Sequence, residues 1–344
     1  MKAAVLTGIR QMELRDVPEP TIKKYDEVLL KIERVGVCGS DVHYYETGRI
    51  GSQIVEYPFI VGHECAATVE AVGRQVTRIK VGDQVAVDPA VSCYECAQCK
   101  MGRENTCYNL RFLGTPGQGG GCLCEYIVMP QQCCYPTGGA VSLEQAVITE
   151  PLSISAYSVS QAEMPQNANI AILGAGPIGL CTFLSAKAEN ANACYMTEKI
   201  QERIEAAKRA GATWVGNPDH QDIVSEILER QPDGVDVAFE CAGQQETIDQ
   251  CVEVLKPGGK LILTGIPRFE RIYLAIDKIR RKEITIVNIR RQNKFTKKAV
   301  DLIAEGKVNV DFMITHRFSL EQTKEAFDLV SGYRDGVIKA IISL

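Results

Sequence analysis

The chain lacks long apolar runs and carries little net charge, and each of these features excludes a class of partner. No stretch approaches the roughly 18 uncharged apolar residues that a transmembrane helix requires. A formal net charge of −5 excludes the broad basic surface with which proteins bind nucleic acids or anionic membranes. We therefore expect a small-molecule partner, with neither a nucleic acid nor a membrane as partner.

We expect no secretion signal in the first residues, because Gly8, Arg10 and Glu13 interrupt their short apolar run. This segment is better explained as a β-strand. The expected compartment is the cytoplasm, where thiols stay reduced. The fourteen cysteines are therefore candidates for metal ligation or simple burial before disulfides.

The 344 residues, 45% hydrophobic and 24% charged, are enough for about two folded domains. Short alternating runs at residues 27–32, 66–72 and 84–87 predict a β-rich region over residues 1–150. From Asn169 onward, strand-like and helix-like segments alternate, which indicates an α/β domain with a parallel sheet. The sequence pattern changes again near residue 291. We expect two helices after it, each followed by a strand, and this segment could extend either domain.

A glycine pattern marks a nucleotide site. The apolar strand before residue 174 leads into G-A-G-P-I-G and then a helix-like run. Gly174 permits the tight turn, Gly176 lets a pyrophosphate approach the backbone, and Gly179 lets helix and strand pack closely. Glu198, 24 residues beyond Gly174, is placed to bind an adenosine ribose and repel a 2′-phosphate.

NAD is therefore favoured over NADP, although the cations Lys199 and Arg203 make that preference less sharp. The structural alternative is that the glycines serve only helix packing and that Glu198 is a solvated charge.

Two sets of residues have the composition of metal sites. Cys93, Cys96, Cys99 and Cys107 form C-x2-C-x2-C-x7-C, and four thiolates fill a tetrahedral zinc shell and leave no position for water. We predict structural zinc here, with an iron–sulfur cluster or unmetallated thiols as alternatives. Cys38, His63 and Glu64 supply the three usual zinc ligand types and an open position, which is the pattern of catalytic zinc. Taken singly, each could be an ordinary core residue.

Together these motifs carry a family resemblance. The segments C-G-S-D-V-H-Y-Y-E-T-G-R-I-G, G-H-E, I-T-E-P-L-S and G-A-G-P-I-G-L, with the four cysteines, resemble zinc-dependent medium-chain alcohol dehydrogenases, and most closely the sorbitol (polyol) branch. The resemblance spans the whole chain and implies an α/β protein that is a homo-oligomer, dimer or tetramer. It implies a GroES-like β-rich catalytic domain from residues 1–153 and 292–344, with a Rossmann NAD-binding domain at 154–291.

The resemblance also implies roles for individual residues. Glu150 would lie beside the catalytic zinc, and Ser40 and His43 would relay a proton. Substrate would contact Tyr44, Phe112, Glu150 and Arg290. The cofactor would contact Gly174, Gly176, Ile178, Gly179, Glu198, Arg203, Thr264, Gly265, Ile266, Asn288, Ile289 and Arg290. Two simpler interpretations stay open: Ser40 as the cap of a helix beginning near Asp41, and Glu150 as an N-cap-like charge before Pro151.

The expected reaction is NAD-dependent oxidation of a secondary hydroxyl in a sorbitol-like or xylitol-like polyol to a ketose, with two zinc ions per chain. Zinc would polarise the hydroxyl, and the nicotinamide would accept hydride. Arg291 stands where the branch usually has tyrosine, and the loop 115–120 lacks that branch's acidic residues. An added cation suggests, as an alternative, a substrate with phosphate or carboxylate, such as a phosphorylated polyol. The simpler interpretation, which keeps the neutral polyol, is that Arg291 points away from the pocket or pairs with an acidic residue. A cyclitol dehydrogenase, an L-threonine dehydrogenase and a nucleotide-binding sensor without turnover also stay open.

Overall fold

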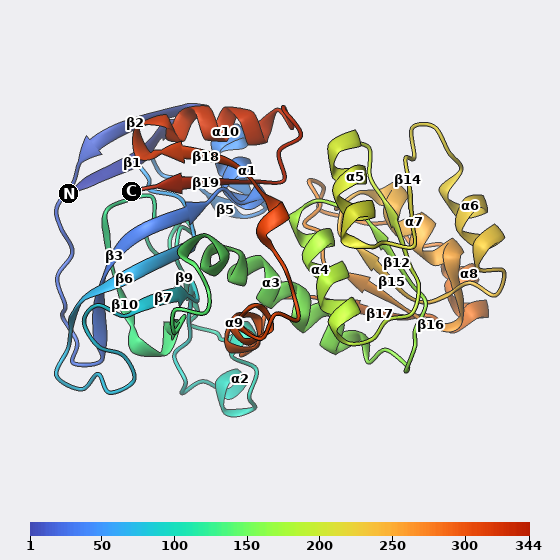
Figure 1. Cartoon of the computed structure of the whole chain (residues 1–344), viewed down its shortest axis with the longest axis horizontal. Coiled ribbons are helices and arrows are strands. Elements are labelled where there is room, and N and C mark those ends of the chain that lie inside the picture. The colour runs from blue at the N-terminus through green and yellow to red at the C-terminus, as the bar shows by residue number, and fades with distance from the viewer. The chain divides into compact units, whose positions relative to one another are not determined.

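The computed structural model describes residues 1–344 and divides the chain into two compact units. The first unit consists of Met1–Glu150, Thr296–Gly306 and Val310–Leu344, and the second of Pro151–Phe295 and Lys307–Asn309. Helix α3 (Leu143–Ala162) contributes its first part to one unit and the rest to the other (Figure 1). None of the helices combines the length and the apolar character that crossing a lipid bilayer requires.

The first unit is dominated by strands. They are β1 (Lys2–Gly8), β2 (Gln11–Asp16), β3 (Glu27–Gly36), β4 (Arg49–Ile50), β5 (Gln53–Ile54), β6 (Glu64–Val72), β7 (Gln84–Val87), β8 (Ala90–Val91), β9 (Arg111–Phe112), β10 (Tyr126–Pro130), β11 (Cys134–Pro136), β18 (Ile314–Ser319) and β19 (Lys339–Ser343). Its short helices are α1 (Gly39–Thr47), α2 (Ala97–Lys100), α9 (Thr296–Ala304) and α10 (Thr323–Ser331), with 3₁₀ turns at Glu104–Thr106, Gln131–Cys133, Asp311–Met313 and Leu320–Gln322.

The main sheet of this unit joins both ends of the chain. Its order is β11-β7-β6-β3-β19-β18, and β10 also pairs with β3. The C-terminal strand β19 runs antiparallel to β3, with Ile341 opposite Gly36 (Figure 1). Alternation along β3 buries Val28, Leu30 and Ile32 and leaves Lys31 exposed, as expected for a sheet packed on one face.

The second unit is a parallel sheet with helices. Its strands are β12 (Ile170–Leu173), β13 (Cys194–Thr197), β14 (Trp214–Gly216), β15 (Val235–Glu240), β16 (Leu255–Leu263) and β17 (Thr285–Asn288), in the order β14-β13-β12-β15-β16-β17. Its helices are α4 (Pro177–Ala188), α5 (Gln201–Ala210), α6 (Ile223–Arg230), α7 (Gln245–Val254) and α8 (Ile276–Lys282). Every strand pair is parallel, and strands such as β12 are buried throughout, so their sequences are continuously apolar.

The expected fold class is confirmed: a β-rich unit accompanies a six-stranded parallel α/β unit. The four elements expected after residue 291 are also present, as α9, β18, α10 and β19. They belong to the first unit, where β19 pairs with β3 and β18 pairs with β19 in the main sheet.

Candidate active site and metal centres

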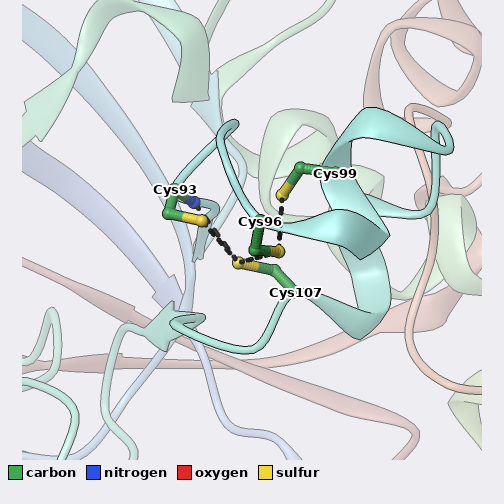
Figure 2. A group of neighbouring side chains, drawn as sticks. All are labelled: Cys93, Cys96, Cys99 and Cys107. Carbon is green, nitrogen blue, oxygen red and sulfur yellow. Dashed lines mark hydrogen bonds between the residues drawn. The ribbon is translucent and has the colours of Figure 1, made fainter.

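The four predicted cysteines converge in one short segment (Figure 2). Sulfur distances are 3.4 Å from Cys93 to Cys107, 3.6 Å from Cys96 to Cys99 and 3.9 Å from Cys96 to Cys107. A tetrahedral site with Zn–S bonds of about 2.3 Å places its sulfur atoms about 3.8 Å apart. The spacing therefore fits four thiolates around one ion, and it is far longer than a disulfide bond of about 2.05 Å.

Local electrostatics also suit a cation at this site. Backbone N–H groups of Cys99 and Tyr108 lower the pKa of the Cys96 thiol to about 6. Burial has the opposite effect on Cys99 and raises the pKa of its thiol to about 12. A buried thiolate at Cys99 needs an opposite charge, which a divalent cation among the sulfur atoms would supply.

The second cluster combines residues from two segments of the first unit. Cys38 directly precedes helix α1, and His63 and Glu64 lie at the start of strand β6. Their ligand atoms all lie within 4.8 Å of one another. A thiol, an imidazole and a carboxylate so close together fit a zinc ion with three protein ligands and one open position.

A carboxylate behind the cluster orients the histidine. Oδ1 of Asp41 lies 3.2 Å from Nδ1 of His63 and accepts the backbone N–H of Gly62 at 3.2 Å. This arrangement leaves Nε2 of His63 as the ring nitrogen for a metal. Burial opposes protonation of the ring, but Asp41 and Cys38 outweigh it and hold the pKa of His63 well above its ordinary value. The cluster thus attracts positive charge.

Glu150 is a buried carboxylate in the same surroundings. It lies inside α3, seven residues after the helix begins at Leu143, so the interpretation as an N-cap-like charge is wrong. The helix continues through Pro151 instead of beginning there. The pKa of Glu150 is raised to about 7, mainly by burial and also by the neighbouring Glu64, although His63 and Lys339 oppose the rise.

The other predicted residues of the first unit surround helix α1. Ser40 lies in its first turn and donates a hydrogen bond to Sγ of Cys38 at 3.3 Å, so it does not cap a helix beginning at Asp41. Tyr44 is buried and donates to Oε1 of Gln53 at 3.0 Å. The Phe112 ring lies 5.3 Å from the His63 ring. His43 is half-buried on the same helix, and the proton relay stays a prediction.

The nucleotide motif lies at one edge of the parallel sheet. Register places Leu173 beside Thr197 and Glu240, and Leu263 beside Glu240 and Asn288. The predicted cofactor residues follow these last paired positions: Gly174, Glu198, Thr264, Gly265, Ile266 and Ile289. Ligands of such sheets bind at the carboxyl ends of the strands.

The glycine loop has the predicted conformation. Gly174 takes a φ of 102°, a left-handed conformation that favours glycine. A Cβ on Gly179 would overlap the carbonyl oxygen of Gly174, so this glycine permits the close approach of helix and strand. Gly176 precedes α4, whose N-terminal N–H groups suit a phosphate, and Ile178 lies in its first turn.

Glu198 connects this loop to the next strand. Its carboxylate accepts hydrogen bonds from the backbone N–H groups of Ala175 at 3.1 Å and of Lys199 at 2.8 Å. Lys199 itself pairs with Asp219 at 2.6 Å. The Arg203 guanidinium is buried near Gly176.

Three residues escaped the sequence interpretation. Asp41 is the third residue after Cys38, but no sequence motif indicated that it contacts His63. Lys339 lies 275 residues after Glu64 yet contacts its carboxylate. Glu240 accepts the N–H groups of Ala242 and Gly243 beside the glycine loop, and its signal was the polar end of an apolar strand.

The remaining predicted residues belong to different units. Tyr44, Phe112 and Glu150 are in the first unit with the metal ligands, whereas Asn288 and Arg290 are in the second. A shared pocket that includes Arg290 stays a prediction.

Comparison with known proteins defines the class. The model of the alcohol dehydrogenase GroES-like domain matches residues 24–139, and that of zinc-binding dehydrogenases matches residues 177–305. The fold and the two ligand sets are those of a dehydrogenase. The chain belongs to the zinc-dependent medium-chain dehydrogenase family, which has a four-cysteine structural zinc site and a Cys/His/Glu catalytic site.

Individual relatives are similar over nearly the full chain. The sorbitol dehydrogenase of Bacillus subtilis is 39% identical over 99% of this chain and 97% of its own length. The structure of a zinc-binding dehydrogenase from Sinorhizobium meliloti 1021, bound to NADP, is 29% identical with a TM-score of 0.91. The match covers 100% of this chain and 99% of that protein's chain. A structure from Escherichia coli CFT073 described as a short chain alcohol dehydrogenase, complexed with NADH, has 28% identity and a TM-score of 0.90, covering 100% and 99%.

Proposed function

We propose that this protein oxidises a secondary hydroxyl group of an acyclic polyol to a ketone, with NAD as the hydride acceptor. The observation that carries the proposal is the mixed cluster of Cys38, His63 and Glu64, whose ligand atoms lie within 4.8 Å of one another. The 39% identity to a sorbitol dehydrogenase supports the polyol class. Zinc bound at this cluster would supply a Lewis acid for the hydroxyl group, and the nicotinamide would accept the hydride.

The protein's own groups would manage the proton and the substrate. Asp41 fixes the ring of His63, and Glu150, with a pKa raised to about 7 by burial, is suited to accept a proton near neutral pH. The Tyr44 hydroxyl donates a hydrogen bond to Oε1 of Gln53, so the Tyr44 oxygen can accept a hydrogen bond from substrate. A hydroxyl-rich substrate needs such partners, because each unmatched buried group costs about 1–3 kcal/mol.

The preference for NAD rests on Glu198. A carboxylate at the end of β13 favours ribose hydroxyls and repels a 2′-phosphate. The ion pair between Lys199 and Asp219 supports this preference, because it removes one candidate cation for that phosphate. The buried Arg203 near the glycine loop is suited to the pyrophosphate.

We also propose that the protein is a homo-oligomer. Strand β17, T-I-V-N, forms one edge of the parallel sheet and carries no charged side chain to protect that edge. Tyr273 and Ile276, in the segment that precedes it, are 76% and 69% exposed. Light scattering coupled to size-exclusion chromatography would show a dimer or tetramer, and a monomer at micromolar concentration would contradict the proposal.

We propose the cytoplasm as the compartment. None of the fourteen cysteines is paired in a disulfide bond, which supports a reducing environment.

A substrate panel followed by NADH absorbance tests the function. Sorbitol, xylitol and galactitol should react well, and simple alcohols poorly. Phosphates of the same polyols test the departure at Arg291, which takes a left-handed backbone conformation with φ 56°. A phosphate preference abolished by Arg291→Tyr would replace the neutral substrate by a phosphorylated one. Activity on a cyclitol or on L-threonine alone would overturn the polyol class, and absence of all turnover would favour a nucleotide-binding sensor.

A further inference from the structure

A lysine without an assigned role lies beside the mixed cluster. Lys339, the first residue of β19, is only 1% exposed, which is rare for a lysine because a buried ammonium must be paired. Its Nζ donates to Oε1 and Oε2 of Glu64 at 2.8 and 2.6 Å. It also donates to the carbonyl oxygen of Val37 at 3.3 Å. The ammonium thus contacts one ligand residue and the peptide directly before another.

The sheet holds this lysine in place. Strand β19 pairs with β3, whose last residue is Gly36, and Gly36 lies opposite Glu64 on β6. A Cβ on Gly36 would overlap Oε2 of Glu64, so glycine leaves the space that the carboxylate occupies. Lysine and carboxylate therefore meet by way of backbone pairing across three adjacent strands, and their contact is a fixed feature of the core.

We infer that Lys339 is a positioning residue that competes with the catalytic metal ion for the carboxylate of Glu64. Both carboxylate oxygens bond to the ammonium, while Glu64 must also supply a ligand atom to an ion held with Cys38 and His63. A carboxylate has about four lone-pair sites, so it can serve both cations at once. Each cation then weakens the hold of the other on the shared carboxylate.

The balance of charges around the cluster sets how strongly it holds a metal ion. Cys38, Glu64, Asp41 and Glu150 are four acidic groups at the cluster, and besides the ligand His63 the Lys339 ammonium offsets their charge, since it pairs with Glu64 and lowers the pKa of Glu150. Removing the ammonium makes the site more negative, which strengthens attraction for a divalent cation and makes that cation a weaker Lewis acid. Lys339 thereby keeps the bound ion reactive and exchangeable.

The inference rests on the proposed function, because it concerns the same metal cluster. Its test is a zinc-binding competition with a colorimetric chelator, together with the visible spectrum after Co²⁺ replaces the zinc. His63→Ala identifies the signal of the mixed cluster, since that variant keeps only the four-cysteine site. The comparison uses the parent, Lys339→Met and Lys339→Arg.

We expect Lys339→Met to bind zinc about tenfold more tightly at the mixed cluster and to change its Co²⁺ spectrum, with a larger loss in kcat than change in KM. Lys339→Arg should restore most of the parent's behaviour. Zinc affinity that is unchanged or weaker in Lys339→Met would overturn the inference, even where thermal stability falls. If Lys339→Met does not fold, Lys339→Gln keeps a hydrogen-bond donor without charge and must show the same tightening.

Lys282→Met is the matched control. The Lys282 ammonium donates to the backbone oxygens of Val252, Glu253 and Leu255 and belongs to the second unit, whereas the metal ligands belong to the first. This variant should lose stability without any change in zinc affinity. A protein that binds metal as described but oxidises no polyol would contradict the proposed function and leave the role of Lys339 intact.

Discussion

The two metal clusters of the first unit are built in opposite ways. The four cysteines come from one segment, Cys93–Cys107, and their sulfur atoms surround a single position with nothing left for a substrate. The mixed cluster takes Cys38 from one segment and His63 and Glu64 from another, and depends on Asp41 and on the distant Lys339. Closure makes the first suitable for stability, and the open position makes the second suitable for chemistry.

The two clusters also differ in what surrounds them. Cys93 and Cys96 lie in a loop near the surface, where backbone N–H groups favour their thiolates. In the mixed cluster His63 and Glu64 are buried among carboxylates and the Lys339 ammonium, while Cys38 is half-buried, so each charged group there depends on its neighbours. Substitution of one ligand should therefore lower the stability of the protein at the four-cysteine site, and should abolish activity at the mixed cluster.

The largest expected effect follows from His63→Ala. Loss of a ligand at the open site should lower kcat/KM for the best polyol by at least about a thousandfold, because metal catalysis contributes several kcal/mol to the barrier. Zinc per chain, measured by elemental analysis, should fall from about two to one. Circular dichroism should show an intact fold. A variant that unfolds would show that this cluster, too, is structural.

Cys96→Ser should have the second largest effect, on stability instead of turnover. Structural zinc contributes directly to folding, so we expect a loss of about 3 kcal/mol or more and a Tm lower by roughly 10 °C. Activity per folded molecule should stay within a few-fold of the parent. Cys251→Ser alters a buried cysteine of the second unit and should cost less while leaving both zinc ions bound. Equal turnover losses in Cys96→Ser and His63→Ala would break the comparison.

The same contrast explains what the sequence could predict. The four-cysteine site and the glycine loop each lie within one short segment, so spacing alone was enough to identify them. The parallel sheet followed from the alternation of strand-like and helix-like segments. Asp41 and Lys339 could not be predicted, because Asp41 meets His63 only when α1 lies beside the start of β6, and Lys339 meets Glu64 only when β19 pairs with β3, the neighbour of β6.

Two of the alternatives left open are wrong for a related reason. Glu150 before Pro151 fits a helix start, but α3 already begins at Leu143 and continues through the proline. Ser40 has the side chain of a helix cap, yet α1 begins at Gly39, with Cys38 in the cap position and the Ser40 hydroxyl donating a hydrogen bond to its sulfur. In both cases the helix begins earlier than the capping residue suggests, and the propensity of one residue does not fix where a helix starts.

Asp41→Asn tests whether the mixed cluster depends on its surroundings as strongly as on its ligands. Loss of the negative charge behind His63 should reduce zinc affinity or kcat by about 10–100-fold, the usual range for such partners. The stability of the four-cysteine site should not change, which thermal unfolding with and without chelator can show. An unaltered metal affinity and kcat would mean that the hydrogen bond to His63 does not tune the site.

The cofactor site is local like the four-cysteine site, so one change there should have a contained effect. Glu198→Ala should lower the ratio of kcat/KM for NAD to that for NADP by about tenfold, corresponding to about 1.4 kcal/mol of lost discrimination. Lys199→Met is the control and should leave the ratio nearly unchanged, because Lys199 is paired with Asp219. A parent enzyme that uses both cofactors equally would refute the role of Glu198.

The smallest effect concerns an ion pair that lies outside both clusters. Arg317 on β18 donates two hydrogen bonds to Glu144 in the first turn of α3, the helix that carries Glu150. The hydrogen bond from Arg317 holds the pKa of Glu144 below its ordinary value. With Arg317 56% exposed and Glu144 27% exposed, solvent screening limits the pair to about 0.5–1 kcal/mol.

Because the folded pKa of Glu144 is lowered, the pair stabilises the protein above the unfolded pKa, about 4.3, and this contribution is lost as pH falls through the folded pKa. Glu144→Gln should therefore lower Tm by a few degrees at pH 7, and the difference from the parent should shrink below about pH 4. Calorimetry over that range measures it, with Glu226→Gln, which breaks the pair with Arg230 on α6, as the control. Zinc content should stay at two per chain. Selective loss of the catalytic zinc from Glu144→Gln would show that the mixed cluster depends on contacts well beyond its own carboxylates. A Tm difference that grows toward acid pH would contradict the stabilising role of the ion pair.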